Sequence, residues 1–324
     1  MTTDDPIDEQ LKVTPPKQWA TGFPAVTHAL QYSLEQTSPR RTAVTLLTIN
    51  QANGIDCPGC AWPEPEPGKR HMNEYCENGA KHINDEATTR RLTREFFAEH
   101  SISDLATKSD MWLNQQGRLT EPMVKQPDSD CYEPIGWDDA FDLLAAQLLG
   151  LDSPDEALFY TSGRVSNEAA FVLQLFARAL GTNNLPDCSN MCHESSGFAL
   201  EETLGVSKGT VSLDDIQRAD LVFVVGLNPG TNMPRMLTAL EDTKRNGGHV
   251  IAVNPLPEAG LIRFKHPQKV RGIIGRGTTI ADQFLHIKPG GDLALFQAIN
   301  ALLLQAEAAS PEAVLDHRFI NAHT

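Results

Sequence analysis

The sequence predicts an α/β protein with a doubly wound, mostly parallel sheet. The run at 221–225 is uninterrupted and apolar, as in a buried strand, and 235–245 has the pattern of an amphipathic helix that closes at Asn246-Gly247-Gly248. A second apolar strand follows at 249–253. A strand, a helix and a strand in this order form one crossover unit, which places the two strands parallel in a Rossmann-like sheet.

The N-terminal third divides into a leader and a cysteine-containing unit. Residues 1–41 are polar and contain several prolines, so we expect an irregular leader over the surface. A β-branched run at 42–49 predicts a strand that leads into the cysteine loop at 57–60. The proline and glutamate run at 63–68 is incompatible with a helix interior or an inner strand. We therefore expect a small, loop-rich domain over 42–110.

The next segment, 111–187, is expected to hold the first part of the α/β structure. A helix is predicted over 138–149, with Asp138 as its N-cap. A buried strand is predicted at 157–160, and an amphipathic helix at 168–180 ends at Gly181, a residue typical of a C-cap. The segment thus repeats the alternation of strand and helix.

The last segment, 188–324, contains the crossover unit. We also expect a helix from Glu194 and a strong helix over 293–305. An apolar element begins near Phe319 and is not terminated before Thr324. We therefore expect this chain to be a fragment of a longer protein, with its last domain incomplete.

Composition excludes several classes of partner. The 324 residues carry 27 Lys+Arg and 42 Asp+Glu, a net charge of −15, which disfavours nucleic acid and anionic membranes. No run of about eighteen apolar residues is present. The twin-arginine-like string Ser38-Pro39-Arg40-Arg41 precedes only a short apolar stretch, and no other export signal is visible. We expect a soluble, cytoplasmic protein that acts on a small molecule.

Three of the six cysteines form the first motif. Cys57-Pro58-Gly59-Cys60 places two thiols on one side of a tight turn, and Cys76 follows. This spacing fits an iron–sulfur cluster, a zinc ion with His71 or another donor, a redox pair or unreactive thiols.

A second motif places Cys188, Cys192 and His193 before the helix expected from Glu194. A thiol at a helix N-terminus beside a histidine suits a metal ligand or a nucleophile. A buried thiol pair beside an ordinary helix cap is the alternative.

The third motif, 226–234, follows a strand and opens a helix, where backbone N–H groups favour phosphate. Gly226 allows close approach of a ligand, and Asn228, Thr231 and Asn232 offer hydrogen bonds. The string is not G-x-G-x-x-G, and Asn254 stands after the next strand in place of an acidic ribose anchor. A purely structural turn and an ordinary nucleotide-dependent enzyme stay open.

Together the motifs resemble the molybdopterin oxidoreductase family, the bis-molybdopterin guanine dinucleotide enzymes that include formate dehydrogenase alpha subunits. The residue strings are similar to those of the YdeP-type, formate dehydrogenase-like branch. Five strings carry the resemblance: Asp56-Cys57-Pro58-Gly59-Cys60 with Cys76-Glu77-Asn78-Gly79, Ser162-Gly163-Arg164-Val165-Ser166-Asn167-Glu168, Cys192-His193, Gly226-Leu227-Asn228-Pro229, and Ala281-Asp282 with Gly290-Gly291-Asp292.

The resemblance implies a molybdenum-bis(molybdopterin guanine dinucleotide) cofactor and a [4Fe-4S] cluster. It implies Cys57, Cys60 and Cys76 as cluster ligands, Cys192 as the molybdenum ligand and His193 as the group that handles the substrate proton. The cofactor-binding residues implied are Ser162, Arg164, Asn167, Gly226, Asn228, Thr231, Asn232, Asn254, Gly290 and Asp292. The expected fold is then an iron–sulfur-type unit followed by Rossmann-like pterin-binding domains.

The implied activity is a two-electron oxidation or reduction of a small substrate, formate being the first candidate, with electrons leaving through the cluster to an unknown partner. Two departures bear on this. The family's third cluster cysteine is missing between Cys60 and Cys76, and Asn78 stands where many members carry a lysine. A zinc-stabilised Rossmann-like binding or assembly protein without redox activity is the alternative function.

Overall fold

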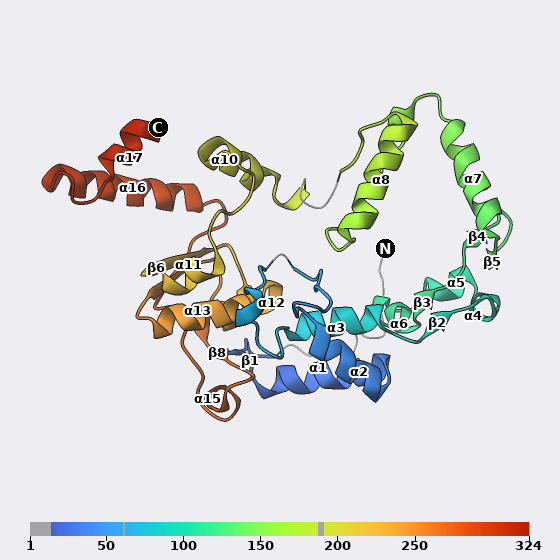
Figure 1. Cartoon of the computed structure of the whole chain (residues 1–324), viewed down its shortest axis with the longest axis horizontal. Coiled ribbons are helices and arrows are strands. Elements are labelled where there is room, and N and C mark those ends of the chain that lie inside the picture. The colour runs from blue at the N-terminus through green and yellow to red at the C-terminus, as the bar shows by residue number, and fades with distance from the viewer. Residues whose placement is uncertain (1–13, 61, 187–190, 324) are drawn as a thin grey trace.

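The computed structural model describes residues 14–60, 62–186 and 191–323. Figure 1 shows a body in which α1, α2 and α3 lie beside α12, α13 and the strand pair β1 and β8. Helices α7, α8, α10, α16 and α17 stand away from that body. The body therefore holds both the cysteine loop and the crossover unit.

The N-terminal part of the body is helical, which corrects the expected leader and strand. It contains β1 (Ala20–Thr21), α1 (Phe23–Gln36), α2 (Pro39–Thr48) and α3 (Glu77–Glu86). Two local signals favour helix α2. The side chain of Ser38 caps the helix by accepting a hydrogen bond from Arg41 N, and Pro39 suits the first helical turn. These capping signals outweigh the strand preference of the β-branched residues.

Buried polar contacts lock these helices together. The hydroxyls of Thr37 and Thr42 lie 2.7 Å apart, and Asn84 Nδ2 donates to Ser33 Oγ at 2.9 Å. An apolar cluster completes the packing with Ala29, Leu46, Ile49, Ala80 and Ile83. Thr42 and Leu46 thus point into a core between helices.

Short elements follow α3 and form two small strand pairs. They are β2 (Arg91–Leu92), α4 (Arg94–Glu99), α5 (Ile102–Leu105), α6 (Asp110–Gln115), β3 (Arg118–Leu119), β4 (Met123–Lys125) and β5 (Tyr132–Pro134). The 3-10 helix η2 (Pro67–Lys69) precedes α3. Strand β2 pairs parallel with β3, and β4 pairs antiparallel with β5.

The next segment departs from the predicted α/β alternation. Helix α7 (Trp137–Leu149) begins two residues after Ile135, with Gly136 rather than Asp138 at the N-cap. The 3-10 helix η3 (Pro154–Glu156) and helix α8 (Asn167–Leu180) follow, and Gly181 ends α8 in the left-handed conformation, as predicted. The predicted strand at 157–160 is not formed. In this segment Phe159 N donates a hydrogen bond to Asn184 O, and Leu158 is 66% exposed.

The crossover unit is confirmed. Helices α10 (Glu194–Leu204) and α11 (Leu213–Arg218) precede β6 (Leu221–Val225), and α12 (Pro229–Asn232), α13 (Met236–Arg245) and β7 (His249–Val253) follow. Strands β6 and β7 run parallel with Leu221 opposite His249, and β9 (Gln283–Leu285) joins β7 in parallel. The sheet order is β6-β7-β9, all parallel, as the predicted α/β class requires.

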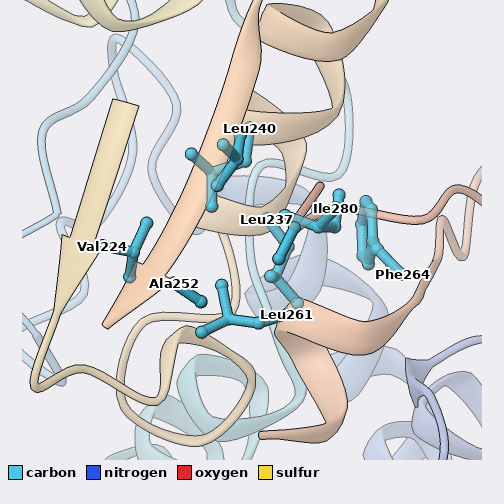
Figure 2. Packing of buried hydrophobic residues seen from close by; sticks show 9 residues of the cluster. Val224, Leu237, Leu240, Ala252, Leu261, Phe264 and Ile280 are labelled. Atoms are coloured by element: carbon cyan, nitrogen blue, oxygen red, sulfur yellow. The ribbon is translucent and has the colours of Figure 1, made fainter. Parts of the chain in front are cut away.

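The core of this unit lies between the sheet and α13. Figure 2 shows Leu237 and Leu240 of α13 facing Val224 and Ala252 of the strands, with Leu261, Phe264 and Ile280 beyond them. Between β7 and β9 lie α14 (Ala259–Ile262), β8 (Phe264–Lys265) and α15 (Val270–Ile273). Strand β8 pairs with β1 of the expected leader, Ala20 opposite Phe264. The N-terminal segment is therefore built into this core.

The last elements are α16 (Asp292–Ala309), which contains the predicted helix at 293–305, and α17 (His317–His323). Glu307 fixes the turn between them. Its carboxylate lies 2.6 Å from His317 Nε2 and accepts from Val314 N and Leu315 N, which lowers its pKa to about 2. In the described ranges, no helix combines the length and apolar character needed to cross a membrane.

Candidate metal and cofactor site

Asn50 organises the cysteine loop. Asn50 follows α2 in a left-handed conformation, with φ of 56°, and its side chain is buried. Its Oδ1 accepts from Cys57 N at 2.8 Å, and its Nδ2 donates to Glu74 O at 2.7 Å. One buried amide thus ties the start of the Cys57–Cys60 loop to the segment before Cys76.

The thiols of Cys57 and Cys76 lie near each other at the start of α3, and the charge of Cys60 acts on both. Cys76 is the N-cap of α3, and its Sγ accepts from Gly79 N at 3.4 Å, while Cys57 Sγ accepts from Gly59 N at the same distance. A Cβ at Gly79 would lie 3.1 Å from Cys57 Sγ and 3.8 Å from Cys76 Sγ. Glycine therefore keeps the space between these two sulfurs open.

Burial dominates the protonation of these thiols. It raises the pKa of Cys57 and of Cys76, and the neighbouring thiols raise both further, because adjacent thiolates repel. Backbone N–H groups of Gly59 and Gly79 oppose the shift. A bound cation would offset this repulsion and favour the deprotonated thiolates.

The third motif lies at the carboxyl ends of β6 and β7. Gly226 has φ of 62° and donates its N–H to Val253 O at 3.0 Å. Asn228 precedes α12, and its Nδ2 donates to Glu258 Oε2 at 2.7 Å. Asn254 is buried and donates to Leu227 O at 3.0 Å. The buried side chain of Asn254 thus anchors the loop that follows β6.

Two glycines let α12 and α14 touch. A Cβ at Gly260 would lie 2.9 Å from both the Cα and the N of Gly230, and a Cβ at Gly230 would lie 3.2 Å from Gly260 Cα. This contact keeps Glu258, just before α14, within reach of Asn228. The loop is therefore held by packing as well as by hydrogen bonds.

The first and third motifs are in direct contact. Asn78 Nδ2 donates to Thr231 O at 2.8 Å. Arg235, at the N-cap of α13, pairs with Glu64 of the proline-glutamate run at 2.6 Å and with Glu74 at 2.9 Å. Positions more than 150 residues apart in sequence thus join the cysteine loop to the end of the sheet.

A cavity of about 700 Å³ adjoins this junction. Its lining includes Cys76, Arg235 and His266, together with apolar side chains of α1. Burial lowers the pKa of His266 to about 4, and the nearby Lys269 adds to the shift. His266 is therefore neutral at pH 7.

The remaining predicted residues lie outside this junction. The exposed segment that opens α8 carries Ser162, Arg164 and Asn167. The pKa of His82 in α3 is lowered mainly by burial and further by the charge of Arg164. Gly290 and Asp292 begin α16. In Figure 1, α8 lies apart from the sheet. Helix α16 contacts the sheet near its start, where the rings of Phe296 and Phe223 of β6 lie 6.3 Å apart. Among the described residues, none of these five makes a hydrogen bond or ion pair with a residue of the first or third motif.

The second motif is also separate. Cys192 is exposed, and His193 occupies the N-cap of α10, where its side chain makes no capping hydrogen bond. Figure 1 places α10 apart from α3 and α12. Cys188 lies outside the described residues.

Comparison with known proteins decides the family. The model of the molybdopterin oxidoreductase family matches residues 118–315. The chain belongs to the molybdopterin oxidoreductase family. The match covers the sheet β6-β7-β9 and the loop that carries the third motif.

Three relatives illustrate the range of the family. An uncharacterized oxidoreductase of Mycobacterium tuberculosis is 57% identical over 317 residues, which cover 98% of this chain and 41% of that protein. Protein YdeP of Escherichia coli is 44% identical over 94% of this chain and 41% of YdeP. The F420-dependent formate dehydrogenase 2 subunit alpha of Methanococcus maripaludis is 30% identical over 66% of this chain and 28% of that subunit. The chain thus spans about two fifths of the first two relatives.

The family implies a molybdenum-pterin cofactor, and the residues of this chain fit it at the sheet edge. Space above Gly226 is open, since a Cβ there would meet nothing within 4 Å, and Thr231 and Asn232 are exposed beside it. The thiols fit a soft, thiolate-bound metal group, because Gly79 leaves room between sulfurs and N–H groups face two of them. Among the described residues, no three His, Cys, Asp or Glu are placed to hold a single metal ion.

Several residues of the junction escaped the sequence analysis. They are Asn50, Glu64, Glu74, Arg235 and Glu258. Glu64 stands in the proline and glutamate run at 63–68, which the sequence predicts to form neither a helix interior nor an inner strand, and Arg235 directly follows the third motif. Their pairing is long-range, so local sequence patterns carry no signal for it.

Proposed function

We propose that this chain is the part of a molybdopterin-dependent oxidoreductase that holds an iron–sulfur group on Cys57, Cys60 and Cys76 next to a bis(molybdopterin guanine dinucleotide) cofactor. The observation that carries the proposal is the contact of Asn78 with Thr231, which joins the thiol loop to the open edge above β6. A one-electron carrier next to a two-electron centre is the arrangement that such chemistry needs.

The chain's own residues would divide the work. Gly226, Thr231 and Asn232 would bind the nucleotide and phosphate part of the cofactor through backbone and amide groups at the sheet edge. When bound, the cofactor supplies two-electron redox chemistry at molybdenum. Cys192 would provide the protein sulfur for the metal, and His193 would take the proton that substrate oxidation releases. This role requires residues 191–193 to reach the sheet edge, from which α10 is displaced in Figure 1.

Formate is the first substrate to test. Two relatives are named formate dehydrogenases: the M. maripaludis subunit, and formate dehydrogenase H of E. coli at 29% identity over 64% of this chain. A small neutral or anionic substrate is consistent with a chain whose net charge of −15 disfavours polyanionic partners. The electron acceptor is proposed to be a separate redox partner.

We expect Cys57→Ser and Cys76→Ser each to lose most of the bound iron, because each removes one of three thiolate ligands. The measurement is iron and acid-labile sulfide per chain after purification without oxygen. Cys131→Ser is the matched control, since Cys131 is a half-buried free thiol outside the motif.

Iron retained in the control and lost in both motif variants supports the assignment. Equal iron in all four proteins contradicts it. Zinc in place of iron, lost in the same two variants, would favour the zinc-stabilised binding protein.

A further inference from the structure

Arg235 forms a partly buried ion triad next to the thiol loop. Its Nη1 donates to Glu64 Oε1 at 2.6 Å, and its Nη2 donates to Glu64 Oε2 and to Glu74 Oε1, both at 2.9 Å. The side chain of Arg235 is 11% exposed, and those of Glu64 and Glu74 are 22% and 14% exposed. Charges in such a position are screened little by solvent, so they act on their surroundings.

The triad is not balanced. One guanidinium faces two carboxylates, which leaves a net charge of about −1. Burial pushes the pKa of Arg235 down, but the hydrogen bonds to Glu64 and Glu74 outweigh it and the pKa is raised, so the arginine stays charged. Its Nε is buried and has no hydrogen-bond partner among the described residues. An unpaired buried donor is costly, and it is available to an acceptor that binds nearby.

The triad is coupled to the thiols by charge and by structure. The charge of Arg235 lowers the pKa of Cys57 and that of Glu64 raises it, although burial is the largest influence. Glu74 lies two residues before Cys76, and its carbonyl accepts from Asn50, which also holds Cys57 N. A change at Arg235 therefore reaches the thiol loop by both routes.

We propose that the Glu64–Arg235–Glu74 triad sets the reduction potential of the iron–sulfur group held by Cys57, Cys60 and Cys76, and this inference rests on the proposed function. Reduction adds one electron, and so one negative charge, to a group in a poorly solvated site. The positive charge of Arg235 stabilises the reduced form, while Glu64 and Glu74 oppose it. Arg235 is thus a positioning residue that also tunes electron transfer.

Two variants with opposite expected signs test the proposal. Arg235→Gln removes the positive charge, so at a fixed ambient potential the ratio of reduced to oxidised cluster should fall about tenfold, equal to about 59 mV for a one-electron couple. Glu74→Gln removes a negative charge and should raise the ratio. It leaves the double hydrogen bond of Arg235 with Glu64 in place, so the loop stays anchored.

The measurement is a redox titration of the anaerobically purified chain, followed by visible absorbance and electron paramagnetic resonance. Arg245→Gln is the matched control, because Arg245 is also on α13 and also pairs with two acids, Glu241 and Asp242, but ten residues from Arg235. Arg235→Lys keeps the charge and should restore a ratio within about threefold of wild type.

The outcomes separate this inference from the proposed function. Opposite shifts for Arg235→Gln and Glu74→Gln, with Arg245→Gln unchanged, support the triad as the tuning element. Iron-loaded variants with the wild-type potential overturn the inference alone. If Arg235→Gln fails to take up iron, Glu74→Gln decides: an unchanged or lowered ratio overturns the inference. A wild-type chain without iron overturns both.

Discussion

Replacing Cys192 with alanine is expected to abolish turnover while leaving the fold intact. Loss of the only protein sulfur proposed to bind molybdenum should lower kcat with formate and a viologen dye by at least about a thousandfold. Cys192 is exposed, so its removal should change the free energy of unfolding by less than about 0.5 kcal/mol. The measurements are kcat, molybdenum content and urea unfolding.

His193→Gln separates the proton role from the ligand role. An imidazole acting as general base contributes about 10²- to 10⁴-fold, so this variant should be slow but keep its molybdenum. Cys131→Ala is the control for thiol removal elsewhere. A near wild-type rate in Cys192→Ala would contradict the assignment of this thiol.

Gly260→Val is expected to have the second-largest effect, through the cofactor loop. Its Cβ would stand 2.9 Å from the backbone of Gly230, and neither backbone can yield without separating α14 from α12. We expect a loss of about 1–3 kcal/mol in the free energy of unfolding. We also expect at least a tenfold loss of guanine nucleotide released on denaturation, because Glu258 would move away from Asn228.

The control for this effect is Gly209→Val. A Cβ at Gly209 meets nothing within 4 Å, so a valine there should leave both quantities unchanged. Nucleotide content at the wild-type level in Gly260→Val would show that the loop does not carry the cofactor.

The crossover unit was predictable because its signals are local. The apolar run of β6, the amphipathic pattern of α13 and the glycines after it each act within one element, and the strand-helix-strand order alone fixes the parallel pairing. The end of α8 at Gly181 followed from the same kind of local signal.

The two incorrect strand predictions, at 42–49 and 157–160, have a common physical origin in tertiary contacts. The β-branched run of α2 is helical because Thr42 and Leu46 bury against α1 and α3 and Ser38 caps the first turn. The apolar run at 157–160 forms no strand: Phe159 N donates to Asn184 O, and Leu158 is exposed instead of packing against the sheet. The local amino-acid composition predicts neither the helix at α2 nor the absence of a strand at 157–160.

The candidate site was predictable in its residue types and less so in its assembly. The convergence of Cys57 and Cys76 follows from a CxxC turn and a cysteine that caps a helix. The ties through Asn50, Asn78 and Arg235 are individual side-chain hydrogen bonds and ion pairs, which leave no periodic pattern in the sequence. The sequence therefore predicts which groups would do the chemistry, and the structure shows what holds the first and third motifs together.

The most direct test of the central claim is a metal analysis of the wild-type chain purified without oxygen. Molybdenum, tungsten, iron and zinc are measured per chain, together with guanine nucleotide released on denaturation. The account predicts several irons per chain, with molybdenum or tungsten and nucleotide present together. About one zinc per chain, with no iron, molybdenum or tungsten, would contradict it and leave a structural thiol site.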